Sequence, residues 1–135
     1  MGSRKEMIAS GTYITEAVAV NGSFEYGVTA TGTTQAAAYK MAANNLVVTT
    51  SSAGVNDGII LPVGDQGDWL QVFNYSAAAV KVYPPVGWGI HGGSLNTPVT
   101  LNAGKAMSFT QMTDPNRATL PAGFSRHEYS YCLSA

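Results

Sequence analysis

Both histidines, the four aspartates and Ser94 are the strongest candidates for acid–base or nucleophilic chemistry. An enzyme must bring an acid, a base or a nucleophile together in a pocket. A Ser-His-Asp site could be drawn from Ser94, His91 and Asp65, but their spacing does not support one and the chain has no Gly-x-Ser-x-Gly elbow. The aspartates lie in predicted turns, where Asp usually bonds the local backbone. We therefore expect no enzyme activity from the residues considered, which are His91, His127, Asp57, Asp65, Asp68, Asp114 and Ser94.

Metal and cofactor chemistry has equally little support in the sequence. His91, His127 and Asp114 could hold a metal ion only if the fold brought them together. The glycines of Gly87-x-Gly89-x-x-Gly92 match a dinucleotide-binding pattern in form, but they neither follow a βαβ pattern nor open a helix. Cys132 is the only cysteine and lies in a predicted strand, so we expect a buried structural thiol. The sequence predicts no catalytic, cofactor or metal site.

The composition is that of a single domain with an unusually uncharged surface. The chain has 135 residues, and hydrophobic residues make up 45% of them. Charged residues make up only 11%, less than half of the usual share of about 25%. This suggests that much of the surface faces other protein, the alternative being an extracellular-type β domain with a neutral polar surface. The net charge of −1 and the scattered Lys and Arg residues predict no direct nucleic-acid partner.

No membrane segment is expected either. The chain has no apolar stretch of about twenty residues, which a membrane-spanning helix needs. Its first residues lack the apolar core of a signal peptide. Together with the single cysteine, this is compatible with synthesis in a reducing cytoplasm.

The first part of the chain is rich in small and β-branched residues and poor in large apolar groups. Asn21-Gly22, between the alternating pieces Ala17–Val20 and Phe24–Val28, is the strongest hairpin-turn signal in the sequence. We interpret residues 1–34 as an extended N-terminal arm or loose hairpin that finds its partner surface on another subunit or protein. Residues 33–44 fit either a helix, because of their alanines, or a strand, because Tyr39, Met41 and Ala43 alternate.

From residue 45 onward the pattern is that of a β protein. Short strands recur between turns that contain glycine or proline, which is typical of a sandwich or barrel. Leu70 and Val72 share one face of a central strand, and Trp69 and Phe73 share the other. We predict an all-β fold, a small antiparallel β-sandwich or barrel-like domain over residues 35–135 with two hairpins. The expected strands are residues 46–50, 58–61, 69–73 paired with 80–83, 99–101 paired with 107–111, and 128–133.

The two tryptophans carry opposite expectations. Trp69 lies in an apolar strand and is expected in the core. Trp88 lies between two glycines in a loop and is expected to be exposed. An exposed Trp88 could stack on a sugar ring or pack against a neighbouring subunit, and we favour the neighbouring subunit.

Residues 44–133 show a particular order of strand ends, turns and a glycine-rich loop. The segments are Leu61-Pro62, Val72-Phe73-Asn74, Ala77 to Ala79, Val80 to Pro84, Gly87 to Gly93, Val99 to Lys105, and Phe109. This order resembles a small β domain that recurs in virion structural proteins of tailed bacteriophages. Such proteins decorate or cement capsids, or form head fibres and tail-associated parts. The resemblance implies trimers that clamp onto a shell, or fibres.

We therefore expect a capsid decoration (cement) protein of the virion, made in the host cytoplasm, that bridges neighbouring capsid subunits. Its partners would be the major capsid protein or another virion protein and two further copies of itself in a homotrimer. The alternative is a head- or tail-fibre module that binds host-surface glycan. Deletion of residues 1–30 is expected to leave a folded domain that no longer binds shells. The residues expected to contact partners are Ile8, Tyr13, Ile14, Phe24, Tyr26 and Trp88.

Overall fold

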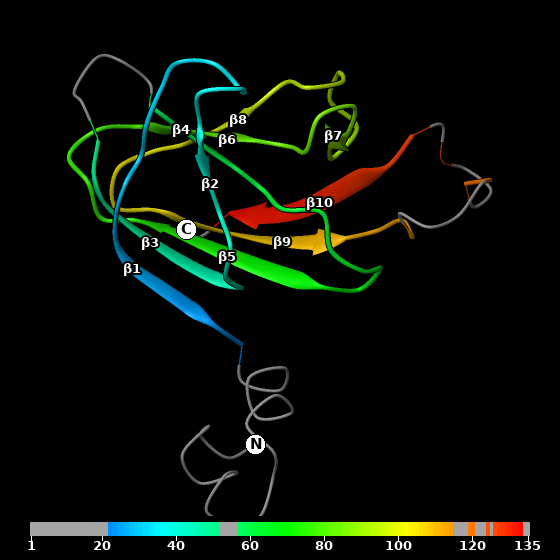
Figure 1. Cartoon of the computed structure of the whole chain (residues 1–135), viewed down its shortest axis with the longest axis horizontal. Helices are drawn as coiled ribbons and strands as arrows, with labels where there is room; N and C mark the ends of the chain where they lie inside the picture. The colour runs from blue at the N-terminus through cyan, green and yellow to red at the C-terminus, as the bar shows by residue number, and fades with distance from the viewer. Residues whose placement is uncertain (1–21, 52–56, 115–118, 121–123, 125, 134–135) are drawn as a thin grey trace, which may run out of the picture.

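The protein folds into two β-sheets that pack face to face (Figure 1). The computed structural model describes residues 22–51, 57–114, 119–120, 124 and 126–133. These residues include ten strands and no helix, which confirms the all-β prediction. The six-stranded sheet has the order β1 (Phe24–Thr29), β3 (Asn45–Thr50), β5 (Trp69–Asn74), β9 (Ala106–Gln111), β10 (Glu128–Leu133) and β7 (Gly89–Ile90). The four-stranded sheet has the order β2 (Tyr39–Lys40), β4 (Gly58–Ile60), β6 (Val80–Tyr83) and β8 (Val99–Leu101).

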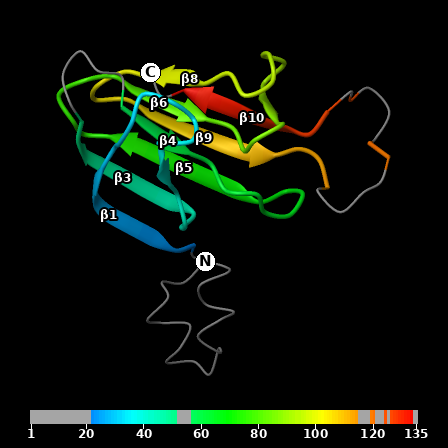
Figure 2. The same ribbon diagram turned by 45° about the horizontal axis from the view of Figure 1, so that its top comes forward.

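From β1 to β6 the chain crosses from one sheet to the other after every strand. Strands β1, β3 and β5 therefore lie side by side and parallel, as do β2, β4 and β6 (Figure 2). The prediction of an antiparallel sandwich is wrong for this part of the molecule. Apart from the isolated antiparallel bridge between Thr31 and Gly58, antiparallel pairs in the described chain occur only later, where β9 pairs with β5 and β10 and where β8 pairs with β6. We call the β1–β6 part the winding.

The core lies between the two sheets and is built from one face of each. In the six-stranded sheet, Leu46 pairs with Val72, which pairs with Met107, and all three side chains are buried. Across the core, Ile59 pairs with Val82 in the four-stranded sheet, and both are fully buried. Burial of an aliphatic side chain of this kind contributes about 1.5–3 kcal/mol. These aliphatic rows hold the two sheets together.

A buried asparagine directs the chain from one sheet to the other after β5. Asn74 Nδ2 donates to the carbonyl oxygens of Ala78 and Leu101, at 2.9 and 3.0 Å. Its Oδ1 accepts from the backbone nitrogen and the hydroxyl of Ser76. The turn therefore leads into the four-stranded sheet, and the predicted hairpin of residues 69–73 with 80–83 is wrong. Side-chain hydrogen bonds at this bend satisfy backbone groups that a hairpin ladder would otherwise pair.

A second bend lies beside the first. Residues 102–105 connect β8 in the small sheet to β9 in the large one, so the predicted hairpin of 99–101 with 107–111 is also wrong. The backbone of Asn74 bonds this turn directly, because its nitrogen donates to Lys105 O and its oxygen accepts from Gly104 N. Two segments far apart in the sequence, 72–74 and 99–105, thus meet at one point of the fold.

Residues 24–31 belong to the β domain and not to a separate arm. Strand β1 pairs with β3, Val28 and Ala30 lie in the core, and Thr31 forms an isolated bridge with Gly58. The expectation that residues 1–34 form an arm is therefore wrong for this part, and a deletion of residues 1–30 would remove a core strand. Asn21 and the residues before it lie outside the described residues. The ambiguous stretch 33–44 forms a turn followed by β2, so the strand alternative is the one observed.

Gly32 allows a tight turn between β1 and β2. Its φ is +70°, and a Cβ at this position would lie 2.6 Å from the carbonyl oxygen of Ala37 and still closer to its Cβ. Gly87 has a similar φ of +83°, but a Cβ there would meet nothing within 4 Å. Alanine substitutions at the two positions can therefore separate two costs in free energy, that of a left-handed backbone conformation and that of a steric clash.

We predict that Gly32→Ala lowers the free energy of unfolding by about 2–4 kcal/mol, through left-handed strain and overpacking together. Gly87→Ala should cost only the conformational part, about 1–2 kcal/mol. Urea unfolding of both variants measures the difference. Equal destabilisation by the two substitutions would show that the contact with Ala37 is not tight.

Candidate contact surface

The solvent-facing side of the six-stranded sheet, here called the outer face, carries an unusual number of aromatic side chains. Strand alternation places Leu70 and Val72 in the core and Trp69 and Phe73 on the outer face. Trp69 is 39% exposed, so the prediction that it lies in the core is wrong. A hollow of about 300 Å³ lies on this face over β5, β9 and β10. Its lining residues include Gln71, Phe73, Ala106, Cys132 and Leu133.

Cys132 contributes to this hollow and is exposed, against the expectation of a buried thiol. It pairs with Ser108 across β9 and β10, and both positions face outward. Tyr131 and Tyr129, one and three residues before Cys132, point to the inward side of the same strand. The sequence predicted the position of this strand correctly, but it did not predict that Cys132 lies on the solvent-facing side.

Strand β1 continues the outer face to the edge of the sheet. Phe24 is 60% exposed and Tyr26 is 79% exposed. Phe24 pairs with Asn45, which pairs with Gln71, so the three lie on the same side of the sheet. Tyr26 follows two residues after Phe24 and faces the same way. Both residues were expected to contact a partner, and the structure leaves both accessible to one.

The edge formed by β1 is the longest open edge among the described residues. The other three edge strands, β7, β2 and β8, have two or three residues each, whereas β1 has six. Proteins usually protect an edge with a short strand, with charge or with proline. Strand β1 has no lysine or proline, and its single charged residue, Glu25, turns toward the core side. Its pairing with β3 is irregular near Gly27, where a bulge interrupts the register. Bulges of this kind can hinder the pairing of an edge strand with another chain.

Glu25 is held inside the fold by two hydrogen bonds. Its Oε1 accepts from the Tyr39 hydroxyl at 2.8 Å, and its Oε2 accepts from the backbone nitrogen of Ala42 at 2.9 Å. The hydrogen bond to Glu25, with smaller contributions from burial and from the carboxylate charge, raises the pKa of the Tyr39 hydroxyl above its usual value. Glu25 thus joins β1 and β2, the first strands of the two sheets.

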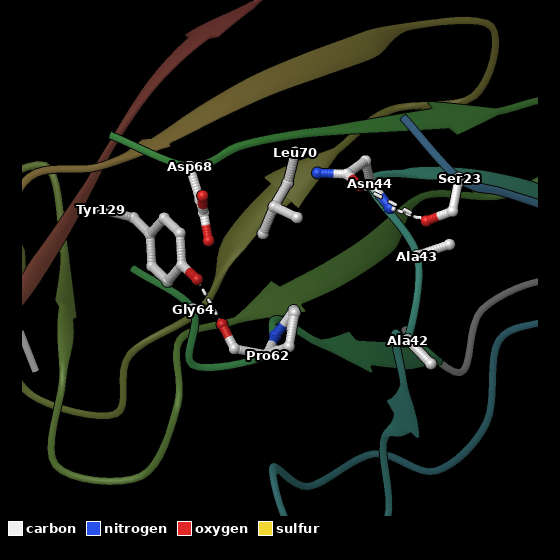
Figure 3. A pocket seen from close by; sticks show the side chains of 9 residues that line it. All are labelled: Ser23, Ala42, Ala43, Asn44, Pro62, Gly64, Asp68, Leu70 and Tyr129. Atoms are coloured by element: carbon white, nitrogen blue, oxygen red, sulfur yellow. Dashed lines mark hydrogen bonds between the residues drawn. The ribbon is translucent and has the colours of Figure 1, made fainter. Parts of the chain in front are cut away.

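A small pocket of about 150 Å³ lies close to the start of β1, beside Ser23 and Asn44 (Figure 3). The Tyr129 hydroxyl donates to the carbonyl oxygen of Pro62 and lies 3.2 Å from Gln111 Oε1. Asp68 Oδ2 accepts from the backbone nitrogen of Asp65 at 2.7 Å. Asn44 Nδ2 donates to Trp69 O. The polar groups around the pocket therefore form hydrogen bonds with other residues of the protein. These bonds join the strands that line the pocket to the neighbouring loops.

Tyr129 makes the stability of the protein depend on pH. Burial, together with the charge of Asp68, raises the pKa of its hydroxyl well above the usual value near 10. The unfolded chain therefore releases this proton first. The stabilisation from Tyr129 is complete below pH 10 and is lost as the pH rises from 10 toward the folded-state pKa.

We predict that Tyr129→Phe lowers the free energy of unfolding at pH 7 by about 1–3 kcal/mol, because Pro62 O loses its donor. The deficit relative to wild type should shrink above pH 10, by at most about 1.4 kcal/mol per pH unit. Urea unfolding at pH 7, 10.5 and 11 measures it. As a control, Tyr26→Phe removes an exposed hydroxyl and should leave wild-type stability at each pH. A deficit that is the same at all three pH values would contradict the assignment.

The expected contact residues fall into three groups in the structure. Phe24 and Tyr26 are exposed and lie together on β1. Ile8, Tyr13 and Ile14 lie outside the described residues. Trp88 was expected to be exposed, and that is wrong, because only 7% of it is accessible. Trp69 and Phe73 were missed as members of the outer face, although the alternation within their strand placed them opposite Leu70 and Val72.

Trp88 is buried because the glycine-rich loop folds back over the core. Its ring stacks on His127, with centroids 5.0 Å apart, and lies 5.6 Å from the ring of Tyr129. Next to it, Gly89 leaves room for the Arg126 side chain. Arg126 Nε lies 3.0 Å from Glu128 Oε1 without being aligned as a hydrogen bond, so this contact is an ion pair. The Trp88 ring is therefore not available to stack on a sugar or on another subunit.

Trp88→Ala should accordingly act as a core substitution. We predict a loss of about 3–5 kcal/mol in the free energy of unfolding, as for other buried aromatic side chains. Trp88→Phe should recover part of this loss. Thermal and urea unfolding measure both variants. A Trp88→Ala protein with wild-type stability would show that the ring packs against a partner and not against His127.

The two histidines considered for catalysis do not form a common site. Each contacts a different hydroxyl group. His91 Nδ1 lies 3.3 Å from Ser130 Oγ, so its serine neighbour is not Ser94. His127 Nδ1 lies 3.1 Å from Thr113 Oγ1. Within the part of the chain that the structure describes, no three His, Cys, Asp or Glu residues are grouped so that they could hold a metal ion. The same residues include no helix long and apolar enough to cross a membrane.

Comparison with known proteins gives no relative to set beside this geometry. No protein-family model matches the chain. No curated protein matches it either. The outer face and the β1 edge are therefore assessed on their own physical properties.

Proposed function

We propose that this protein is a structural protein of a bacteriophage virion that decorates the capsid and bridges neighbouring capsid subunits. The observation that supports it most is the exposed aromatic pair Phe24 and Tyr26 on the long open edge strand β1. The low share of charged residues, 11%, agrees with a surface that is largely covered in an assembly. The sequence resemblance to phage decoration and head-fibre proteins supplies the class of assembly.

In this proposal the protein is adhesive and has no catalytic role. Burial of an exposed aromatic or large aliphatic side chain against a partner contributes about 1.5–3 kcal/mol. The outer face offers Phe24, Tyr26 and Trp69 for such burial, beside the hollow over β5, β9 and β10. A homotrimer would present three such faces at once, and linked weak contacts add up to a high avidity. The partner is the major capsid protein or another virion protein, and the protein is made in the host cytoplasm.

Glycan binding is the alternative function. The structure does not favour it, because the side chain expected to bind the sugar is buried. The side chain expected to stack on a sugar was Trp88, which is covered by His127 and the core. The aromatic residues that remain exposed are Phe24, Tyr26, Tyr75 and, in part, Trp69. Phe24, Tyr26 and Trp69 belong to the outer face and none of them lines the hollow over β5, β9 and β10, so they favour a protein contact over a sugar pocket.

We predict that Phe24→Ser and Tyr26→Ser each weaken binding to shells of the major capsid protein by about 10- to 100-fold, which corresponds to about 1.5–3 kcal/mol. Co-sedimentation with shells assembled without this protein measures the affinity. Tyr75→Ser is the matched control, since Tyr75 is 70% exposed but lies after β5, away from the edge strand. Saturation of shells by both variants at wild-type concentrations would refute the contact surface.

A further inference from the structure

We propose that residues 12–20 of one copy add a strand to the open β1 edge of a neighbouring copy, so that the copies of the oligomer exchange their N-terminal segments. This inference rests on the homo-oligomer within the proposed function and deepens it. It does not depend on shell binding.

The backbone of β1 offers free hydrogen-bonding groups to an added strand. Ser23 O accepts from Asn45 N at 3.0 Å, so the backbone groups of residue 23 face β3. In a regular strand this direction alternates, so the groups of Glu25 also face β3. Those of Phe24 and Tyr26 face the open edge. An extended chain that pairs here would gain main-chain hydrogen bonds, which is the usual basis of strand addition.

A second β1 strand is a poor occupant of this edge. In an antiparallel pair of β1 strands centred on residue 25, Phe24 would face Tyr26 of the partner subunit and the two Glu25 side chains would face each other. Like charges directly opposite one another destabilise a sheet. Glu25 also has no freedom to turn away, because Tyr39 and Ala42 hold both of its oxygens. The edge therefore favours a strand with an uncharged residue opposite Glu25.

Residues 12–20 have the composition that the edge requires. They read Thr-Tyr-Ile-Thr-Glu-Ala-Val-Ala-Val, rich in β-branched residues, and Ile14, Val18 and Val20 fall on one side when extended. Nine extended residues span about 30 Å, which exceeds the length of the six-residue strand β1. The segment has one charged residue, Glu16, on the same side. With Ile14, Val18 or Val20 opposite Glu25, it would cover the edge without setting one carboxylate against another.

The first described residues disfavour a tight return of this segment onto its own β1. A two-residue turn at Asn21-Gly22 would need Ser23 O to accept a hydrogen bond from Val20 across the hairpin. Ser23 O already accepts from both the backbone nitrogen and Nδ2 of Asn45. Gly22 lies against the ring of Trp69, where an added Cβ would be 3.0 Å from it, so the chain leaves the domain at the outer face. From there a neighbouring copy is within reach.

Disulfide crosslinking between different chains tests the exchange. All chains are full length and carry Cys132→Ser, so that no native thiol interferes. One set carries a first affinity tag and a single substitution, Thr15→Cys, Ala17→Cys or Ala19→Cys. The other carries a second tag and Tyr26→Cys, or Tyr75→Cys as the control. Each pair is unfolded together, refolded together and oxidised.

We expect at least one of the three N-terminal positions to form a crosslink with Tyr26→Cys that contains both tags, and none to do so with Tyr75→Cys. Absence of mixed crosslinks at all three positions would overturn the proposal. So would crosslinks that form only within a chain when both cysteines are placed in one copy, since this would mean that the segment covers its own edge.

The oligomer provides a second readout that does not depend on cysteine geometry. Tyr26→Lys places a charge on the edge strand and should lower the mass in light scattering from the oligomer to the single chain, with an unchanged circular dichroism spectrum. Tyr75→Lys should leave the oligomer intact. A wild-type protein that is a single chain at micromolar concentration would overturn the exchange. If the exchange fails while shells are still bound, the proposed decoration function stands without it.

Discussion

Parallel pairing within two stacked sheets is the constraint on which the rest of this structure depends. Parallel strands cannot be joined by a tight turn, so the chain must travel elsewhere before it returns beside its previous strand. Here it travels through the opposite sheet, and each circuit adds one strand to both sheets. The aliphatic rows of Leu46 and Val72 on one side and Ile59 and Val82 on the other follow directly, because they are successive circuits of the same winding.

The winding also explains why polar residues are buried at its bends. A chain that leaves a sheet at a sharp angle has backbone groups that no ladder satisfies. Asn74 and Gln111 take over this task, each 1% exposed and each bonded to carbonyl or amide groups of other segments. Asn74 and the turn at residues 102–105 that it bonds therefore specify how the chain changes sheets, while Phe24 and Tyr26 lie on β1.

The positions of most strands could be predicted from sequence, whereas their partners could not. Runs such as Leu46–Thr50 and Val80–Tyr83 identify strands because β-branched residues alternate or cluster between turn residues. The short alanine turn between β5 and β6 looks the same for a hairpin and for a crossing between sheets, and only the three-dimensional partners of Asn74 distinguish them. Phe24 and Tyr26, two of the residues expected to contact a partner, are exposed. Trp88 was expected to be exposed because it lies in a glycine-rich loop, but His127 and Tyr129 cover its ring.

The strand order has a consequence for how the domain forms. The middle of the six-stranded sheet is the pair β5 and β9, and β9 follows the whole winding in the chain. The first strands therefore cannot complete a core until a segment far along the sequence arrives. Folds with mostly non-local pairings of this kind form slowly, in milliseconds to seconds, because the chain must be closed over long distances first. During that interval β1 is paired only with β3 and its other edge is exposed. Partly folded chains with an exposed strand edge are prone to aggregate.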